Sequence, residues 1–286
     1  TAVTKKKIKR CKEDVVFDAA CFIILTLVLF VVAYPLYWVI ISSISAPSAV
    51  SSGKVLLHPI GFTLKGYAEV FKNDQVMRGF LNSLIITFCG VMVNLIVTLP
   101  TSYALSRSNF SGKKPITIFY LITMFFGGGL IPTYLVIQRL QMLNTIWALI
   151  LPGCLSVYNM IVARTFFKSN ISEELYEAAE IDGCTQARFF FQIALPLSKA
   201  IIAILVLYYG VGHWNSYFSA LVYISDKAKY PLQLVLRNIL ITNQTALSQT
   251  ATTAAARAAL QEKQQLIDVM KYSLIIISSI PVLVMY

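Results

Sequence analysis

The stretch SEELYEAAEIDGCTQARFFFQIALP, residues 172–196, has the composition of a helix, a sharp turn and a second helix. Ser172 is a good N-cap residue, and the two glutamates after it offset the partial positive charge of a helix N-terminus. Gly183 stands where a left-handed residue commonly ends a helix. Thr185 can cap a second short helix, and Pro196 predicts the turn into the next segment. The stretch therefore predicts two short helices, the first acidic and exposed to water.

The rest of the chain is too apolar for a soluble protein. Hydrophobic residues make up 57% of the 286 residues and charged residues only 13%, against about 25% charged residues in soluble domains, and the mean hydropathy is +0.70. A helix that spans a bilayer needs about 20 apolar residues. Six runs without Asp, Glu, Lys or Arg predict helices near 16–44, 80–105, 115–137, 144–167, 198–224 and 268–286. We therefore expect an all-α membrane protein with six transmembrane helices, the last of them continuing a few residues beyond this sequence.

The net charge of +11 indicates how these helices are oriented. Lys and Arg are enriched before the first predicted span and in the second and fourth loops, whereas the third loop has only Arg139. Excess Lys and Arg in short loops marks the cytoplasmic side. Residues 1–15 are then a basic cytoplasmic segment, and residues 16–286 form the transmembrane domain, with external loops at about 45–79 and 225–267. We expect the basic residues to contact anionic lipid, and no nucleic acid is expected as a partner.

Glycines interrupt two of the predicted spans. They are Gly127, Gly128 and Gly129, followed by Pro132, in the third span, and Gly210 and Gly212 in the fifth. Glycine in a span permits close helix packing, and it also permits a bend that lines a translocation path. The sequence leaves both interpretations open.

The residues needed for a metal site or for catalysis are sparse. The five cysteines form no CxxC motif, and only His58 and His213 offer imidazole groups, so neither a disulfide framework nor a metal site is expected. A GxxxxGK[ST] phosphate loop is absent from the sequence. We expect no cofactor in this chain and no enzymatic activity of its own.

The predicted cytoplasmic loop, residues 169–197, also carries a spaced pattern. Its members are Glu177-Ala178-Ala179, Gly183 after three residues, Ile193 after nine more, and Leu195-Pro196. This pattern resembles the EAA loop of ABC importer permeases at every signature position. As in that family, the loop lies on the cytoplasmic side between the fourth and fifth of six spans. The segments 125–134 and 212–215 are similar to the carbohydrate-uptake (MalG-like) branch of the family.

The resemblance implies the fold of a type I ABC importer permease in the bacterial cytoplasmic (inner) membrane. The implied partners are a cytosolic ABC ATPase dimer that holds ATP and Mg, a second homologous permease subunit, an extracytoplasmic solute-binding protein and an oligosaccharide. The ATPase-coupling residues by this resemblance are Glu177, Ala178, Ala179, Asp182 and Gly183. Two adjacent alanines leave a low surface that a partner can approach, and the flanking acids can pair with its basic groups.

The predicted external loops and the charges of the spans bear on the substrate and on the class of transporter. An acidic oligosaccharide, such as one derived from alginate or pectin, would suit the basic external residues Lys227, Lys229 and Arg237. The Ala- and Thr-rich stretch 243–261 is consistent with a polar helix and also with a flexible connector. The alternative function is an ion-coupled secondary transporter, which usually needs intramembrane carboxylates, and the second to fifth predicted spans lack these.

Polar and aromatic residues in the fourth and fifth predicted spans are candidates for contact with substrate. They are Asn159 in the fourth span and His213, Trp214, Asn215 and Tyr217 in the fifth. Polar groups in a span usually face the interior of the bundle. Sugars are held by hydrogen bonds and by an aromatic plane beneath the apolar face of the ring. Packing and hydrogen bonding between helices explain the same residues equally well from the sequence alone.

Overall fold

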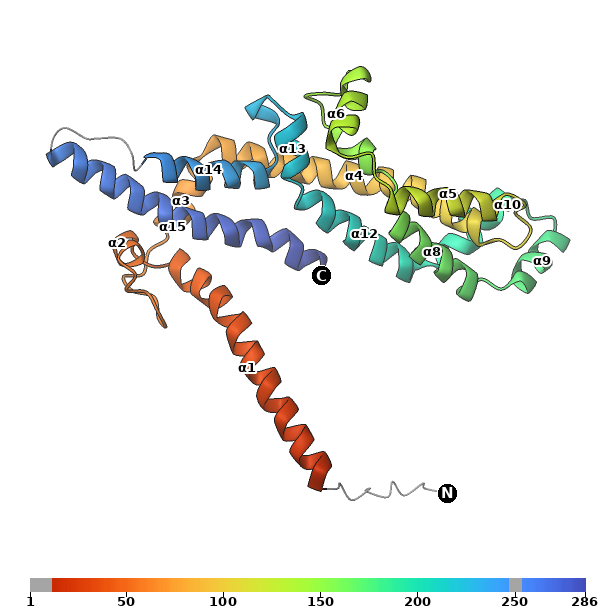
Figure 1. Ribbon diagram of the computed structural model, residues 1–286, viewed down its shortest axis with the longest axis horizontal. Helices are drawn as coiled ribbons and strands as arrows, with labels where there is room; N and C mark the ends of the chain where they lie inside the picture. The colour runs from red at the N-terminus through yellow and green to blue at the C-terminus, as the bar shows by residue number, and fades with distance from the viewer. Residues whose placement is uncertain (1–11, 247–253) are drawn as a thin grey trace. The chain divides into compact units, whose positions relative to one another are not determined.

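The computed structural model describes residues 12–246 and 254–286, and every regular element in these ranges is a helix (Figure 1). The basic residues before Lys12 and residues 247–253 of the Ala- and Thr-rich stretch lie outside the described ranges. Three helices are long and apolar enough to cross a membrane: α1 (Lys12–Ser43), α4 (Asp74–Ser106) and the C-terminal part of α15 (Ala254–Met285).

Three further segments qualify as spans only when two bent helices are taken together. The first pair is α5 (Lys113–Phe125) with α6 (Leu130–Arg139), bent by 113°, and the second is the turn Trp147–Gly153 with α8 (Val157–Asn170), bent by 52°. The third pair is Gln186–Leu197 with α12 (Lys199–Trp214), bent by 80°. By length and composition the described residues therefore contain three to six spans.

The bends change the predicted boundaries of three spans. The predicted helix 115–137 is divided between α5 and α6, and the predicted helix 144–167 begins as the short turn α7 (Trp147–Ile150) before α8. The predicted helix 198–224 was wrong as a single element, because α12 ends at Trp214 and α13 (Phe218–Tyr223) follows after a short linker.

Glycine is suited to positions 129 and 210 for different structural reasons. Gly129 has a φ of 84°, and a Cβ on Gly127 or Gly129 would meet no atom within 4 Å. Close packing therefore does not explain this group, whereas backbone freedom at a bend does. At Gly210 a Cβ would lie 2.9 Å from the sulfur of Met285, so helix packing accounts for this glycine.

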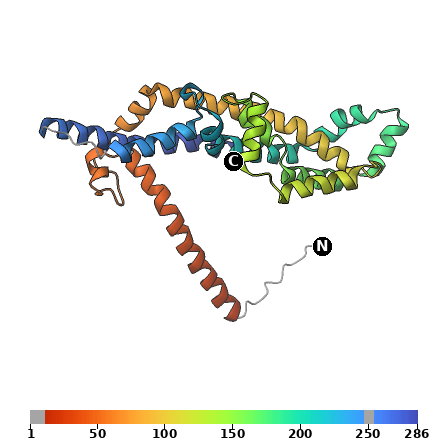
Figure 2. The ribbon, with the colours of Figure 1, turned by 45° about the horizontal axis from the view of Figure 1, so that its top comes forward.

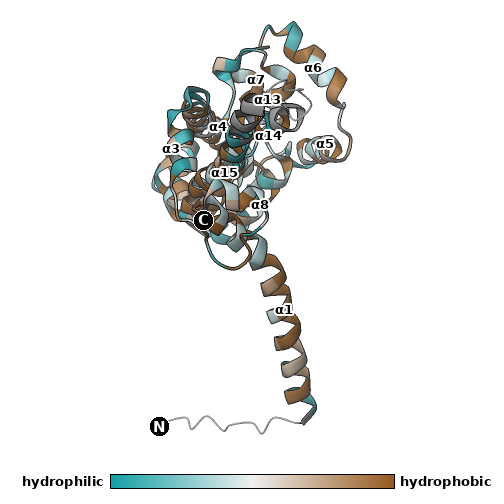
Figure 3. Ribbon diagram, turned by 90° about the vertical axis from the view of Figure 1, so that its left-hand side faces the viewer, coloured by the Kyte–Doolittle hydropathy of each residue, from teal (hydrophilic) through white to brown (hydrophobic). Residues whose placement is uncertain are grey.

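The chain forms two compact units, of which the first comprises residues up to 69 together with 249–276. Most side chains along α1 are exposed and apolar, and the brown colour of α1 in Figure 3 shows that hydrophobic residues make up most of the helix. At the C-terminal end of α1, the indole N–H of Trp38 donates to the carbonyl of Val55 at 2.8 Å, and its ring packs edge-on against Tyr272. The exposed apolar length of α1 suits contact with lipid or with another membrane helix.

The second unit, residues 70–248 with 277–286, is built around α4. Helices α8, α12 and α14 (Leu232–Ala246) pack along this 33-residue helix (Figure 1). Two buried clusters hold the unit together, one that includes Leu99, Phe167, Phe189 and Leu205, and another that includes Ile86, Ala148, Ala220 and Leu234. Helix α4 therefore contacts every other large helix of this unit.

Candidate functional site

The helix and turn predicted within residues 172–196 are present. Helix α9 (Glu173–Ile181) begins at Ser172, whose hydroxyl accepts a hydrogen bond from the N–H of Leu175 at 3.3 Å. The helix ends at Ile181 and the chain turns at Gly183, which has a left-handed φ of 74°, and the N–H of Cys184 donates to the carbonyl of Ala179 at 2.9 Å. A glycine suits this position because a Cβ is unfavourable in the left-handed region.

The second helix of this segment is longer than predicted. It begins as α10 (Gln186–Phe189), where the Thr185 hydroxyl accepts from the N–H of Arg188, and it continues without a break to Leu197. Pro196 therefore lies inside the helix, and the turn into α12 comes at Ser198. The prediction that Pro196 marks the turn was wrong by two residues.

The five coupling candidates are not equally accessible. Glu177, Ala178, Asp182 and Gly183 are exposed, whereas Ala179 is partly buried and packs against the core of the second unit. Ile181, at the end of α9, exposes 87% of its surface. Helix α9 lies at one end of the second unit (Figure 1 and Figure 2). The exposed face of α9 thus combines acidic and small or apolar side chains, which is a suitable surface for a protein partner.

The inner face of α9 is fixed to the C-terminal end of α4 by Arg107. The guanidinium carbon of Arg107 lies 3.9 Å from the centroid of the Tyr176 ring, and its Nη2 atom lies 2.8 Å from Oε2 of Glu173. The other carboxylate oxygen of Glu173 accepts a hydrogen bond from the N–H of Ser108 at 3.1 Å. The sequence signals this role only weakly, because Arg107 stands in it as one of several basic residues in a short loop.

The environment of Glu173 keeps its carboxylate ionised. Burial acts to raise the pKa of Glu173, but hydrogen bonds from Ser108 and the charges of Arg107 and Lys113 outweigh this effect, so the pKa lies below its ordinary value of 4.5. Both members of the ion pair, Glu173 and Arg107, are therefore charged at neutral pH.

A second polar site lies along one face of α4. Gly90, Asn94, Thr98 and Ser102 follow one another at intervals of four residues, which places them on the same face of the helix. We call these four residues the polar seam. Its three side chains contact the elements packed against α4, and all three are buried.

The polar seam satisfies the backbone of the bent fourth segment. The amide group of Asn94 donates to the carbonyls of Gly153 and Cys154 at 2.8 and 3.0 Å, where the turn before α8 leaves them without helical partners. The hydroxyl of Thr98 lies 2.7 Å from that of Tyr209, which accepts from the N–H of Ser156. A bend at membrane depth is stable only when its free backbone groups find such partners.

His213 contacts this seam directly. Its Nε2 atom lies 2.8 Å from Oδ1 of Asn94, and its ring lies against Gly90. Because both amide hydrogens of Asn94 are used by the two backbone carbonyls, Oδ1 must accept the hydrogen bond from His213. When the His213 ring is neutral, its proton is therefore on Nε2, and Nδ1 is an acceptor.

The other path candidates separate into buried and exposed residues. Trp214 is buried, its indole N–H donates to the carbonyl of Ser278 at 2.9 Å, and its ring packs edge-on against Phe80. Asn159 is buried in the first turn of α8. Asn215 and Tyr217, in the linker between α12 and α13, are exposed. Of the two interpretations left open for Trp214, the structure favours packing.

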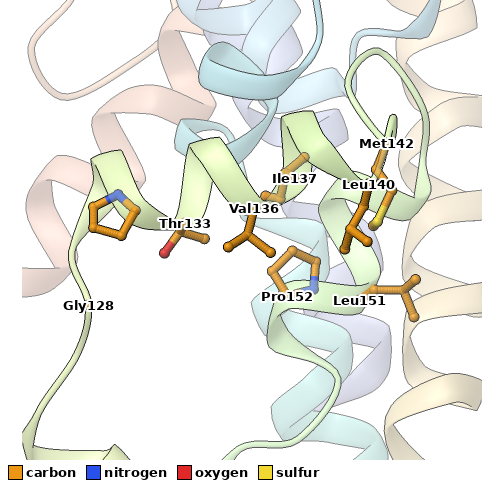
Figure 4. A pocket seen from close by; sticks show the side chains of 9 residues that line it. Gly128, Thr133, Val136, Ile137, Leu140, Met142, Leu151 and Pro152 are labelled. Carbon is orange, nitrogen blue, oxygen red and sulfur yellow. The ribbon is translucent and has the colours of Figure 1, made fainter.

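An apolar cavity of about 450 Å³ lies beside α6 (Figure 4). Pro132, Thr133 and Val136 line it from α6, and Leu151 and Pro152 line it from the turn before α8. Among the described residues no group of three or more His, Cys, Asp or Glu side chains could hold a metal ion. The cavity suits an apolar group rather than a sugar, because few polar atoms face it.

Known proteins resemble this chain over nearly its whole length, although no family model matches it. It is 34% identical over 270 residues to YtcP of Bacillus subtilis (strain 168), a polygalacturonan/rhamnogalacturonan transport system permease protein, with 94% of this chain and 92% of YtcP covered. It is 36% identical over 275 residues to the protein LplC of the same organism, with 96% and 90% covered.

A solved structure has the same fold. A chain in the crystal structure of a bacterial ABC transporter involved in the import of the acidic polysaccharide alginate matches with a TM-score of 0.87 and 26% identity, and 97% of this chain and 96% of that chain are covered. The family that the sequence pattern indicated is thereby confirmed. This chain belongs to the family of permease subunits of sugar ABC importers.

Proposed function

We propose that this permease carries an acidic oligosaccharide across the bacterial cytoplasmic membrane, driven by ATP hydrolysis in a separate ATPase dimer that binds ATP and Mg. Its relatives are membrane proteins and transport components rather than enzymes. The observation that carries the proposal is the exposed, acidic helix α9, whose sequence pattern and position match the EAA loop of such permeases.

The proposed topology has six spans, with the N-terminus in the cytoplasm. The three continuous and three bent candidate spans support this number. With six spans, α9 lies on the same side as the basic N-terminal segment, in agreement with the distribution of Lys and Arg. The segment 225–267, proposed to be external, contains the short turn Lys227–Lys229, α14 and the first part of α15.

In the proposed mechanism, α9 docks into a groove on the ATPase. Glu177 and Asp182 would pair with basic groups of the ATPase, and Ala178 would allow close approach, with Ala179 supporting it from the inner face. Gly183 sets the angle at which α9 leaves the second helix of the loop. Closure of the ATPase dimer would move α9 together with its counterpart in a second, homologous permease subunit, and the two permeases would open in turn to each side.

An acidic substrate is supported by two independent observations. Similar proteins include a polygalacturonan/rhamnogalacturonan transport system permease and a transporter involved in the import of the acidic polysaccharide alginate, and galacturonans and alginate carry carboxylates. Lys227 and Lys229 are exposed in a loop whose conformation is fixed, since Asn144 accepts hydrogen bonds from the N–H groups of Ser225 and Asp226. Basic side chains around an entrance raise the local concentration of an anionic substrate. An extracytoplasmic solute-binding protein would deliver it.

The proposed substrate path uses His213, Asn215 and Tyr217, with Asn159 and Trp214 as supporting residues. His213 offers a hydrogen-bond acceptor at Nδ1 for a sugar hydroxyl, and the exposed Tyr217 ring offers an apolar plane. The buried positions of Asn159 and Trp214 suit them to holding the path in shape.

The test is purification of the chain from its native membrane in mild detergent. We expect an ATPase, a second permease and a binding protein to co-purify, and the reconstituted complex to import an oligogalacturonate only when ATP is supplied inside. Uptake by the chain alone, driven by a sodium or proton gradient, would instead establish the alternative function of an ion-coupled secondary transporter.

A further inference from the structure

We propose that Arg107 is the positioning residue that makes α9 move together with α4, so that a displacement of α9 reaches the centre of the second unit directly. This inference rests on the proposed coupling function of α9. Arg107 is neither a member of the EAA pattern nor a candidate for contact with the ATPase, because its side chain is largely buried beneath α9.

Few residues of α9 are buried against the rest of the second unit. Tyr176 is its only buried residue, Glu173 and Ala179 are partly buried, and the remaining side chains of α9 are exposed. Glu173 and Tyr176 are three positions apart and therefore lie on the same face of the helix. Both contact Arg107, so this one side chain bridges two residues on the inner face of α9.

The contact of Arg107 with α9 combines stacking on an aromatic ring with an ion pair. The guanidinium group stacks on the Tyr176 ring at 3.9 Å and pairs with Glu173 at 2.8 Å. A lysine could pair with Glu173 but could not stack in the same way, because its ammonium group is a compact point charge. Phe189 packs edge-on against Tyr176, and Tyr103 of α4 packs on Phe189, so the contact continues into the buried aromatic cluster.

The position of Arg107 at the end of α4 determines which helix is connected to α9. It caps the C-terminus of the helix, directly after Ser106, and the polar seam lies on the preceding turns. The backbone around α9 connects it only to α8 and to the second helix of the loop. Arg107 adds a third connection, and this one leads to the helix that holds Asn94 and, through it, His213. A displacement of α9 is thereby transmitted directly to α4, without passing first through α8 or α12.

The test compares Arg107→Lys with Lys114→Gln in the complete importer in proteoliposomes, with oligogalacturonate on the binding protein as probe. Lys114 is an exposed cation nearby on α5 and serves as the matched control. We expect Arg107→Lys to lower the amount of sugar imported per ATP by about two- to thirty-fold, the range of coupling effects seen for residues that connect two sites. We expect Lys114→Gln to leave this ratio unchanged. An unchanged ratio in Arg107→Lys would overturn the inference.

A second measurement needs neither the ATPase nor the sugar. A nitroxide label on Ile181, in the full chain in lipid nanodiscs, should become more mobile in Arg107→Lys and in Tyr176→Leu but not in Lys114→Gln. Unchanged mobility in both variants would contradict the inference even where an assembled complex cannot be obtained. A normal importer after Glu177→Lys would count against the proposed coupling function, and it would leave the label result on Arg107 intact.

Discussion

The imidazole of His213 donates a hydrogen bond from Nε2 to Oδ1 of Asn94, over a distance of 2.8 Å. The two residues come from different helices, α12 and α4, and Asn94 in turn holds the carbonyls exposed by the bend before α8. One buried amide thus connects three of the candidate spans. This arrangement requires the close approach of His213 to Gly90.

Gly90→Ala should displace the His213 ring, because a Cβ at this position would lie 2.5 Å from Nε2. The contact is with a ring held by a hydrogen bond, so relief requires movement of His213 or of α12. We expect slower sugar uptake per assembled complex, measured in proteoliposomes, and a lower thermal stability. Gly212→Ala is the control, since a Cβ there meets no atom within 4 Å. Equal uptake in both variants would mean that His213 has no role in transport.

Gly183→Ala should weaken the coupling turn, because a non-glycine residue in the left-handed region costs about 1 kcal/mol or more. Gly183→Asn should be milder, since asparagine adopts this conformation more readily. We expect less ATPase to co-purify with Gly183→Ala and still less with Gly183→Pro, whose φ is incompatible with the observed 74°. Full recovery of the ATPase with Gly183→Pro would contradict the role assigned to this turn.

Trp214→Ala should reduce stability rather than selectivity. The side chain is buried, its indole N–H donates to the carbonyl of Ser278, and its ring contacts Phe80, so truncation leaves a cavity and removes this hydrogen bond. The expected loss is about 3–5 kcal/mol, detected as a lower melting temperature of the chain in detergent. Tyr217→Ala, at an exposed position, should leave the melting temperature unchanged and lower uptake. The opposite pattern would reverse the roles proposed for these two residues.

The attachment of α9 should depend on pH through Glu173. Because the pKa of Glu173 in the folded chain lies below 4.5, the ionised carboxylate contributes to stability above pH 4.5, and the contribution is lost as the pH falls through the lowered pKa. A nitroxide label on Ile181 should therefore have constant mobility between about pH 6 and 8 and become more mobile in acid. In Glu173→Gln the label should already be mobile at neutral pH and respond much less to acid. A wild-type label that stays immobile in acid would show that Tyr176 alone holds the helix.

The sequence determined the elements that depend on local composition. Runs without charge predicted the membrane helices, and the N-cap at Ser172 with the glycine at position 183 predicted α9 and its turn, because both depend on residues that are near one another in the chain. The EAA pattern is equally local, and it was sufficient to indicate the family. The glycine group at 127–129 left close packing and a bend as open interpretations, and it did not indicate the angle of 113°.

Contacts between residues far apart in the sequence follow from the packing of the helices. Nothing in the spacing of Arg107, Glu173 and Tyr176 indicates that a guanidinium group stacks on one and pairs with the other, and the polar residues of the spans gave no preference between packing and transport. In the fold, Trp214 is enclosed by Phe80 and Ser278, while Tyr217 remains exposed three positions later. The physical reason is that side-chain contacts between helices depend on the rotation and bending of each helix, and these follow from packing over the whole bundle rather than from the local sequence.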